Sequence, residues 1–274
     1  MWYFLAATAM KLPFRTVAPA REMRRPAPAA LPKLSDCSVA AMYRAARIGG
    51  DYYDFLFADA CLIFMFSDIA GKREEALNVA AVVQERFHEL GPKIFQDGRG
   101  NRNDQITDLT IELNRTIIEA SAGVRCAPAF LGCYDERVGI LSYINAGHTP
   151  AILRDDDGIT LLRAAGPPLG LFSHSTHDAQ LSTLQPGAAL VLVSKGLVES
   201  RAGSHEFGTE RVQQFLASRR FQTAQEICSG LLGNVHEFIE THKGMFRQKG
   251  PENDVTALAL LRAAEVGHAS AASA

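Results

Sequence analysis

Residues 49–72 read GGDYYDFLFADACLIFMFSDIAGK, and this stretch decides the fold. Asp51–Phe57 and Cys61–Phe66 are dominated by apolar and aromatic residues, which predicts two strands. The second run is almost entirely apolar, so we expect that strand to be buried on both of its faces.

Downstream of these strands the apolar spacing becomes that of helices. From Glu74 to Leu90 apolar residues recur at intervals of three and four, and we expect Gly91-Pro92 to stop this helix. A second helix is expected to have Asp104 as its N-cap and to end at Gly123.

Strand periodicity then returns after the two helices. The expected strands there are Ala129–Tyr134, Ile140–Asn145, Ala151–Arg154, Thr160–Arg163, Ala188–Ser194 and Val255–Arg262, and one more strand, Ser38–Arg44, is expected before the opening stretch. Asp155–Gly158 is a hairpin turn, and two late helices are expected at Glu210–Ser218 and Thr223–His242. Antiparallel strands interrupted by pairs of helices predict an α+β layered domain whose helices cover its sheets.

Composition sets the boundaries of this domain. The 274 residues are 47% hydrophobic and 21% charged, which suits one large core. We expect a Pro/Ala-rich N-terminal extension over residues 1–36, the folded domain over residues 37–262 and an Ala/Ser-rich tail over residues 263–274.

Charge and cysteine content exclude several classes of protein. A net charge of −2 gives no basic face, so we expect no nucleic-acid partner. Met1–Met10 is apolar but too short to span a bilayer and lacks the positive start of a signal peptide, so no membrane span is expected. Five cysteines without C-x-x-C spacing indicate free thiols in a reducing compartment, hence a cytoplasmic protein.

Four short motifs lie where predicted strands begin or end. They are Gly49-Gly50-Asp51-Tyr52-Tyr53-Asp54, Ser67-Asp68-Ile69-Ala70-Gly71-Lys72, Ser194-Lys195-Gly196-Leu197 and Asn253-Asp254-Val255-Thr256. Strand ends that converge on carboxylates suggest a site for a hard metal ion.

These motifs, with Asn145-Ala146-Gly147-His148-Thr149-Pro150 and Gly166-Pro167-Pro168-Leu169-Gly170 between them, occur in an order that resembles the bacterial PPM-type serine/threonine phosphatases of the SpoIIE and RsbU group. The resemblance covers residues 37–262. It implies an αββα sandwich of two mainly antiparallel sheets flanked by helices, with two Mn²⁺ or Mg²⁺ ions at one edge. The implied substrate is phosphoserine or phosphothreonine on an anti-anti-sigma-type regulator protein.

The resemblance also assigns roles to individual residues. Asp68 matches the aspartate that bridges the two metals, and Ile69 matches the position whose backbone carbonyl ligates one of them. Asp51 matches the carboxylate of the first motif, near the metals or their waters. Asp51 and Asp68 are therefore the expected catalytic residues, and a metal-activated water is the expected nucleophile.

Two positions depart from the family pattern. Lys195 stands where the family has an aspartate, and a lysine ammonium has no lone pair to offer a metal. Asn253 stands where the family has the ligating aspartate, which leaves at best a neutral carbonyl. The charge at Asp51, Asp68, Lys195 and Asn253 is thus −1 instead of −4, so we expect weak or incomplete metal binding.

A consequence is expected for Lys195. Its ammonium could fill the vacated metal position and pair with Asp68, which would lower the pKa of Asp68. Asp254 is adjacent to Asn253, but successive strand residues face opposite sides, so it could replace Asn253 only through a slip or bulge.

Three functional hypotheses remain at this stage. The first is an active metal-dependent phosphoprotein phosphatase in a bacterial partner-switching pathway, whose catalysis Lys195 and Asn253 are expected to impair. The second is a pseudophosphatase that binds a regulator protein through the same fold. The third is an α+β domain in which the motifs are coincidental.

Overall fold

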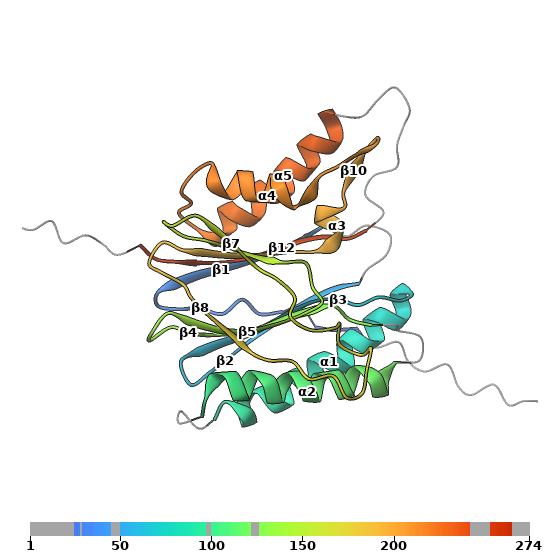
Figure 1. Cartoon of the computed structure of the whole chain (residues 1–274). Coiled ribbons are helices and arrows are strands. Elements are labelled where there is room, and N and C mark those ends of the chain that lie inside the picture. Colours follow the sequence, from blue (N-terminus) through green and yellow to red (C-terminus); the bar gives the residue numbers. More distant parts are fainter. Residues whose placement is uncertain are drawn as a thin grey trace, which may run out of the picture.

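Two five-stranded antiparallel sheets stack face to face, and helices cover both outer faces (Figure 1). The computed structural model describes residues 25–27, 29–44, 50–96, 100–121, 126–241 and 253–264. The predicted α+β class and the αββα arrangement are confirmed.

One sheet, called the β1 sheet below, has the order β1-β12-β9-β6-β7. Its strands are β1 (Cys37–Arg44), β12 (Val255–Arg262), β9 (Ala189–Val193), β6 (Ala151–Arg154) and β7 (Ile159–Leu162). Helices α4 (Gly208–Ala217) and α5 (Ala224–Thr241) cover its outer face (Figure 1).

The other sheet, the β2 sheet, has the order β2-β3-β4-β5-β8. Its strands are β2 (Asp51–Ala58), β3 (Cys61–Asp68), β4 (Ala129–Asp135), β5 (Ile140–Ala146) and β8 (Gln180–Thr183). Helices α1 (Arg73–Ile94) and α2 (Arg102–Ala120) cover it (Figure 1). A short α3 (Lys195–Val198) follows β9, and β10 (Arg201–Ala202) pairs with β11 (His205–Glu206).

Strand β3 is central to its sheet and is buried on both faces, as predicted. Ile63 and Met65 belong to the core cluster shared with α1 and α2. Phe64 and Phe66 belong to the cluster between the two sheets. The alternation follows from the two-residue period of a strand, and it sets which side chains face the layer between the sheets.

A two-residue turn joins β2 to β3. Asp59 and Ala60 have φ values of 48° and 58°, the left-handed conformation that non-glycine residues rarely adopt. Arg102 Nη2 donates to Asp59 Oδ2 at 2.5 Å, so a charge-assisted contact from the first residue of α2 holds this turn.

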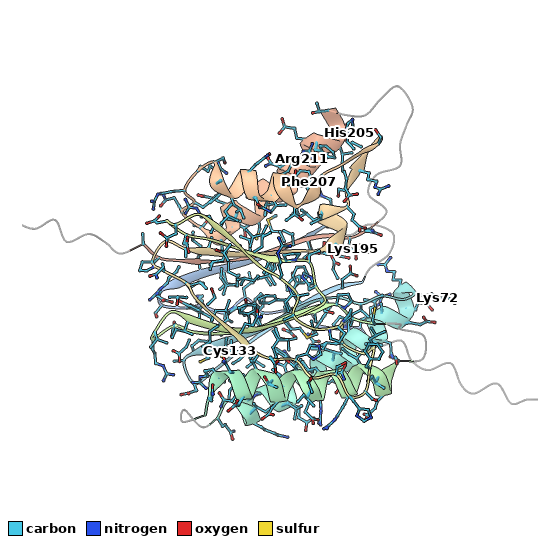
Figure 2. The ribbon with its side chains drawn as sticks, viewed as in Figure 1. Lys72, Cys133, Lys195, His205, Phe207 and Arg211 are labelled. Carbon is cyan, nitrogen blue, oxygen red and sulfur yellow. The ribbon has the colours of Figure 1, made fainter. Side chains whose placement is uncertain are left out.

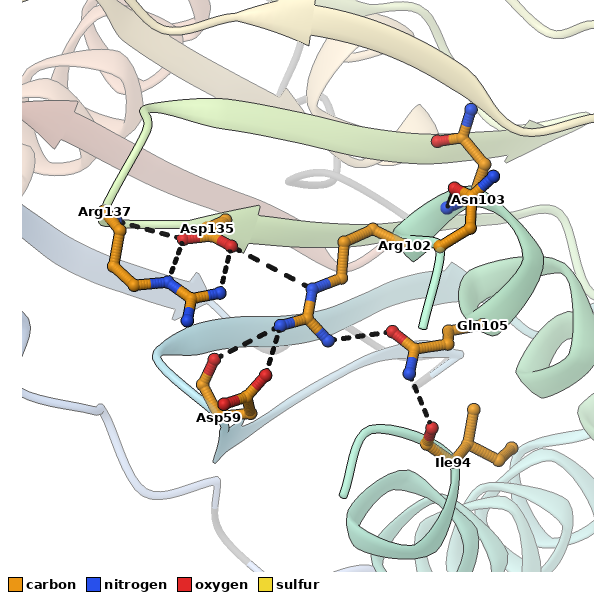
Figure 3. A network of polar contacts seen from close by, with 8 residues as sticks. Asp59, Ile94, Arg102, Asn103, Gln105, Asp135 and Arg137 are labelled. Carbon is orange, nitrogen blue, oxygen red and sulfur yellow. Dashed lines mark hydrogen bonds and ion pairs between the residues drawn. The ribbon is translucent and has the colours of Figure 1, made fainter. Parts of the chain in front are cut away.

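The same arginine is the centre of a wider network (Figure 3). Arg102 Nη1 donates to Gln105 Oε1, and Gln105 Nε2 donates to the carbonyl of Ile94 at the end of α1. Arg102 Nε lies 3.9 Å from Asp135 Oδ2 at the end of β4, and Asp135 also binds Arg137. The network therefore ties the ends of α1, α2, β3 and β4 together.

Two predicted helix boundaries are wrong. Helix α1 runs through Gly91 and Pro92 to Ile94, so Gly91 does not end the helix. Its missing side chain instead allows α1 to pack closely on β2. A Cβ at Gly91 would lie 2.3 Å from Leu56 Cδ2 on β2. The N-cap of α2 is Asn101, whose side chain accepts a hydrogen bond from the backbone N–H of Asn103, and Asp104 lies in the first turn.

Four short elements, β8, α3, β10 and β11, were not predicted from the sequence. Each has four residues or fewer, too short for a periodic pattern. The predicted helix ends at Gly123 and His242 lie outside the described residues.

Part of the segment before residue 37 packs on the domain. Gln84 of α1 accepts from the backbone N–H of Ala27 and donates to its carbonyl. Leu34 contacts the core between the sheets. Asp36 Oδ2 accepts from Tyr134 Oη at 2.8 Å and from Arg262 Nε at 3.0 Å. The domain boundary at residue 37 stays a prediction, but residues 29–36 are not a free linker.

All five cysteines are free thiols, and four of them are buried. None of the helices in the described part of the chain combines the length and apolar character needed to cross a bilayer.

The contact between Gly91 and Leu56 is testable. Gly91→Ala should lower the free energy of unfolding by about 1–3 kcal/mol, because the new methyl group overlaps Leu56 and the helix must shift away from β2. Gly233→Ala in α5 is the matched control, since no atom lies within 4 Å of its Cβ position and alanine favours a helix by about 1 kcal/mol. Urea denaturation of both variants decides the point, and equal stabilisation of both would contradict the packing role of Gly91.

Candidate functional site

Four strand ends from both sheets meet at one edge of the sandwich. Asp51 at the start of β2 lies directly opposite Asp68 at the end of β3. Thr256 of β12 donates its hydroxyl to Asp51 Oδ2 at 2.5 Å, which joins the two sheets. A Cβ at Gly196 of α3 would lie 2.8 Å from the Cβ of Asn253, so these two motifs are also in contact.

The strand period explains which side chains enter the layer between the sheets. On β2 and β3, Phe55 and Phe66 face that layer, so Asp51 and Asp68 share their side. On β12, Leu258 faces the same layer, which places Asp254 and Thr256 there by the same alternation.

Asp254 therefore lies at the candidate site, although the sequence analysis allowed it a role only through a slip or bulge of the strand. Its side chain is buried, and its Oδ2 accepts from the backbone N–H of Gly50 at 3.2 Å and from Tyr43 Oη at 2.9 Å. Asn253, one residue earlier, is exposed. The signal lies in the strand geometry, because the two-residue period that turns Leu258 and Thr256 into the layer between the sheets extends back to position 254.

The carboxylates at this edge carry uncompensated charge. Burial raises the pKa of Asp51 to about 7, the charges of Asp68 and Asp254 act in the same direction, and hydrogen bonds from Thr256 and Ser194 oppose it. Burial also raises the pKa of Asp68. Close carboxylates with little countercharge favour a cation or a proton among them.

The expected pairing of Lys195 with Asp68 is wrong. Lys195 is the first residue of α3, and its Nζ lies 3.5 Å from Glu199 Oε1 one turn later in the chain. Its side chain is 60% exposed, at the edge where Figure 2 also shows Lys72. Its charge lowers the pKa of Asp68 only in part, so that pKa is raised instead of depressed.

The oxygen atoms beside Gly50 suit one hard cation. A Cβ at Gly50 would lie 2.9 Å from the carbonyl oxygen of Ile69 and 3.4 Å from Asp68 Oδ1, so glycine leaves space where these two oxygens converge. Asp51 lies opposite Asp68 and adds a third hard donor. Asp51, Asp68 and the Ile69 carbonyl are thus the residues that would hold an ion.

A complete two-ion centre does not fit these residues. Lys195 has an ammonium without a lone pair and pairs with Glu199, and Asn253 offers only an amide oxygen. Within the described ranges, no three or more His, Cys, Asp or Glu side chains are arranged to hold a metal ion.

Comparison with known proteins identifies the family. Residues 58–263, more than half of the chain, match the family described as Stage II sporulation protein E (SpoIIE). The chain belongs to the SpoIIE family. It has the PP2C fold of that family, and the resemblance seen in the motifs is confirmed at the level of a SpoIIE/RsbU-like phosphatase domain.

Individual relatives of this SpoIIE-family domain are distant. Protein IcfG of Synechocystis sp. (strain ATCC 27184 / PCC 6803 / Kazusa) is 26% identical over 238 residues, which cover 78% of this chain and 38% of IcfG. Phosphoserine phosphatase RsbP of Bacillus subtilis (strain 168) is 32% identical over 68 residues, 24% of this chain and 17% of RsbP. The chain thus spans less than half the length of either relative.

Among solved structures, the RsbU and RsbW domains of Rv1364c from Mycobacterium tuberculosis superpose with a TM-score of 0.69 at 22% identity. The match covers 85% of this chain and 63% of that one. At this identity the similarity establishes the fold.

The raised pKa of Asp51 predicts a pH-dependent stability in metal-free buffer. An aspartate whose pKa rises from 3.8 unfolded to about 7 folded binds more protons when folded, so its contribution to stability is present below pH 4 and is lost as pH rises to 7. With about 1.4 kcal/mol per pKa unit and some solvent access, we expect Asp51→Asn to be more stable than wild type by on the order of 2 kcal/mol at pH 8.

Urea denaturation in EDTA between pH 4 and pH 8 measures this effect. The exposed Asp178→Asn is the matched control and should follow wild type. A difference between Asp51→Asn and wild type that does not change with pH would contradict the burial of an ionised Asp51.

Proposed function

We propose that this chain is a PPM-type phosphatase domain with impaired catalysis toward phosphoserine or phosphothreonine on a regulator protein. The proposal rests on how the site residues divide between the inside of the sandwich and its surface. Asp51, Asp68 and Asp254 lie toward the layer between the sheets, whereas Lys195 and Asn253 occupy exposed positions without a carboxylate.

The proposed roles follow from the donor atoms. Asp51, Asp68 and the Ile69 carbonyl would hold one Mn²⁺ or Mg²⁺ ion, which when bound would supply an activated water and neutralise phosphate charge. Asp51 and Asp68 are the proposed catalytic carboxylates. Asn253 gives a second ion a neutral oxygen at most, so metal binding is weak or incomplete.

The substrate class rests on the family and on its relatives. RsbP is named as a phosphoserine phosphatase, and Rv1364c carries an RsbU domain together with an RsbW domain. These names favour a phosphorylated regulator of the anti-anti-sigma type as partner, in a cytoplasmic partner-switching pathway.

The second candidate is a pseudophosphatase that binds such a regulator without hydrolysing it. The orientation of Lys195 supports it, because an exposed ammonium at the site edge can pair with a phosphoryl group of a bound protein. The two functions differ in whether Asp68 is needed for turnover.

A phosphopeptide assay with Mn²⁺ separates them. We expect wild-type turnover well below about 1 s⁻¹, an ordinary enzyme rate, and a further loss of at least tenfold in Asp68→Asn. Equal residual rates in wild type and Asp68→Asn would favour the pseudophosphatase. Wild-type turnover at about 1 s⁻¹ or more would refute impaired catalysis.

Restoring the two missing carboxylates should restore metal binding. Lys195→Asp combined with Asn253→Asp changes the charge at the four positions from −1 to −4, and both positions are exposed enough to accept the change without repacking. We expect Mn²⁺ affinity by calorimetry to rise by at least about tenfold in the double variant, and by less in either single variant. Unchanged affinity in the double variant would place the metal ligands elsewhere.

A further inference from the structure

A groove runs between α4 and α5 on the outer face of the β1 sheet, the face turned away from the β2 sheet (Figure 1). Its volume is about 650 Å³. The residues that line it recur at helical spacing from Phe207 to Ser218 and again from Gly230 to Thr241, so each helix contributes one stripe. A stripe of this length spans roughly 16 Å, or about three helical turns.

Aromatic rings fix the shape of the groove. Phe207 and Phe238 meet edge to face at one end, with ring centroids 5.5 Å apart. At the other end Phe215 lies against Gly230, where an added Cβ would be 2.4 Å from Phe215 Cζ. Because Gly230 has no side chain, Phe215 can lie across α5. The partly buried ring of Phe215 gives the groove an apolar surface.

Two arginines line the groove, and each lies over an aromatic ring. Arg211 Cζ is 4.8 Å from the centroid of Phe238, and its Nη1 donates to the backbone carbonyls of Glu206 and Phe207. Arg219 Cζ is 5.6 Å from the centroid of Phe215. Neither guanidinium has an ion pair with a carboxylate in the described part of the chain. Since a guanidinium has five N–H donors, both arginines keep donors for an anionic partner.

The charges that line the groove favour such a partner. Arg211 and Arg219 are opposed by Glu237 alone among the described lining residues, which leaves one excess positive charge. A second copy of the chain would bring the same excess to an isologous contact, so like charges would meet. The length of the groove and its position between two neighbouring helices suit a third helix, as in helix-in-groove recognition.

We propose that this groove binds an acidic amphipathic helix of a partner protein. Apolar side chains of that helix rest on Phe215. Two of its carboxylates, about two turns apart, pair with Arg211 and Arg219, which are separated by roughly 12 Å along the helix axis. The proposal involves neither metal binding nor turnover at the candidate site, so it is independent of the proposed phosphatase function.

Fluorescence anisotropy of designed peptides with the full chain tests the proposal. The acidic probe is a labelled peptide of about 18 residues, long enough to form a helix, with leucine along one stripe and glutamate beside it at two-turn spacing. The matched basic probe has lysine in place of every glutamate. We expect the acidic peptide to bind at least about tenfold more tightly, because its carboxylates pair with the arginines whereas ammonium groups are repelled.

Reversing one charge in the groove should reverse this preference. Arg219 is exposed and its described contacts are with aromatic rings, so Arg219→Glu should keep the fold, which circular dichroism checks. We expect this variant to bind the acidic peptide at least about tenfold more weakly and the basic peptide more tightly than wild type does. Arg115→Glu, on α2 at the other outer face, is the matched control and should bind both peptides as wild type does.

A neutral obstacle separates binding in the groove from general attraction between charges. Gln214 is an exposed lining residue of α4, and Gln214→Trp should abolish binding of the acidic peptide without changing the charge. Equal binding of both peptides to wild type, or acidic-peptide binding that survives both Arg219→Glu and Gln214→Trp, would overturn the proposal. A wild-type dimer in sedimentation velocity that Gln214→Trp dissociates would assign the groove to a second copy and would overturn it as well.

Discussion

The register of β2 on β3 is the constraint on which the candidate site depends. Asp51 lies opposite Asp68 only because the two-residue turn at Asp59-Ala60 fixes the pairing at the far end of the hairpin. A slip of one residue would turn one strand over and move its aspartate to the helix side. Arg102 holds this turn through its ion pair with Asp59. That ion pair, at the far end of the hairpin, therefore helps to position Asp51 and Asp68.

The site exists because strands of both sheets direct alternate side chains into the layer between the sheets and end at the same edge. Side chains that face the layer between the sheets are apolar along most of the strands and become Asp51, Asp68 and Asp254 where the strands end. Carboxylates at the edge of an apolar layer are partly desolvated, which raises the pKa of Asp51 and of Asp68. The fold thus concentrates negative charge where little in the described protein neutralises it.

The strands and layers were predictable from periodicity, whereas the site was predictable only in part. A nearly continuous apolar run located β3 and its burial on both faces. Gly91-Pro92, in contrast, indicated a helix end, because the need for space against Leu56 is tertiary and has no local signal. Lys195 was expected at Asp68, yet an unpredicted helical turn carries its side chain toward Glu199. Strand parity alone, followed back from Leu258, would have identified Asp254.

The two positions proposed as departures from the family pattern lie where the fold can tolerate them. Lys195 and Asn253 are exposed, so exchanging a carboxylate there disturbs no packing, and a fold-level match at 22% identity is insensitive to it. The aspartates that remain are the partly buried ones, and holding them near one another costs stability at neutral pH. A protein that needed only the fold, and not these carboxylates, would gain stability by losing them. Their presence supports the proposal that this edge binds a positive charge, either a metal ion or a basic group of a partner protein.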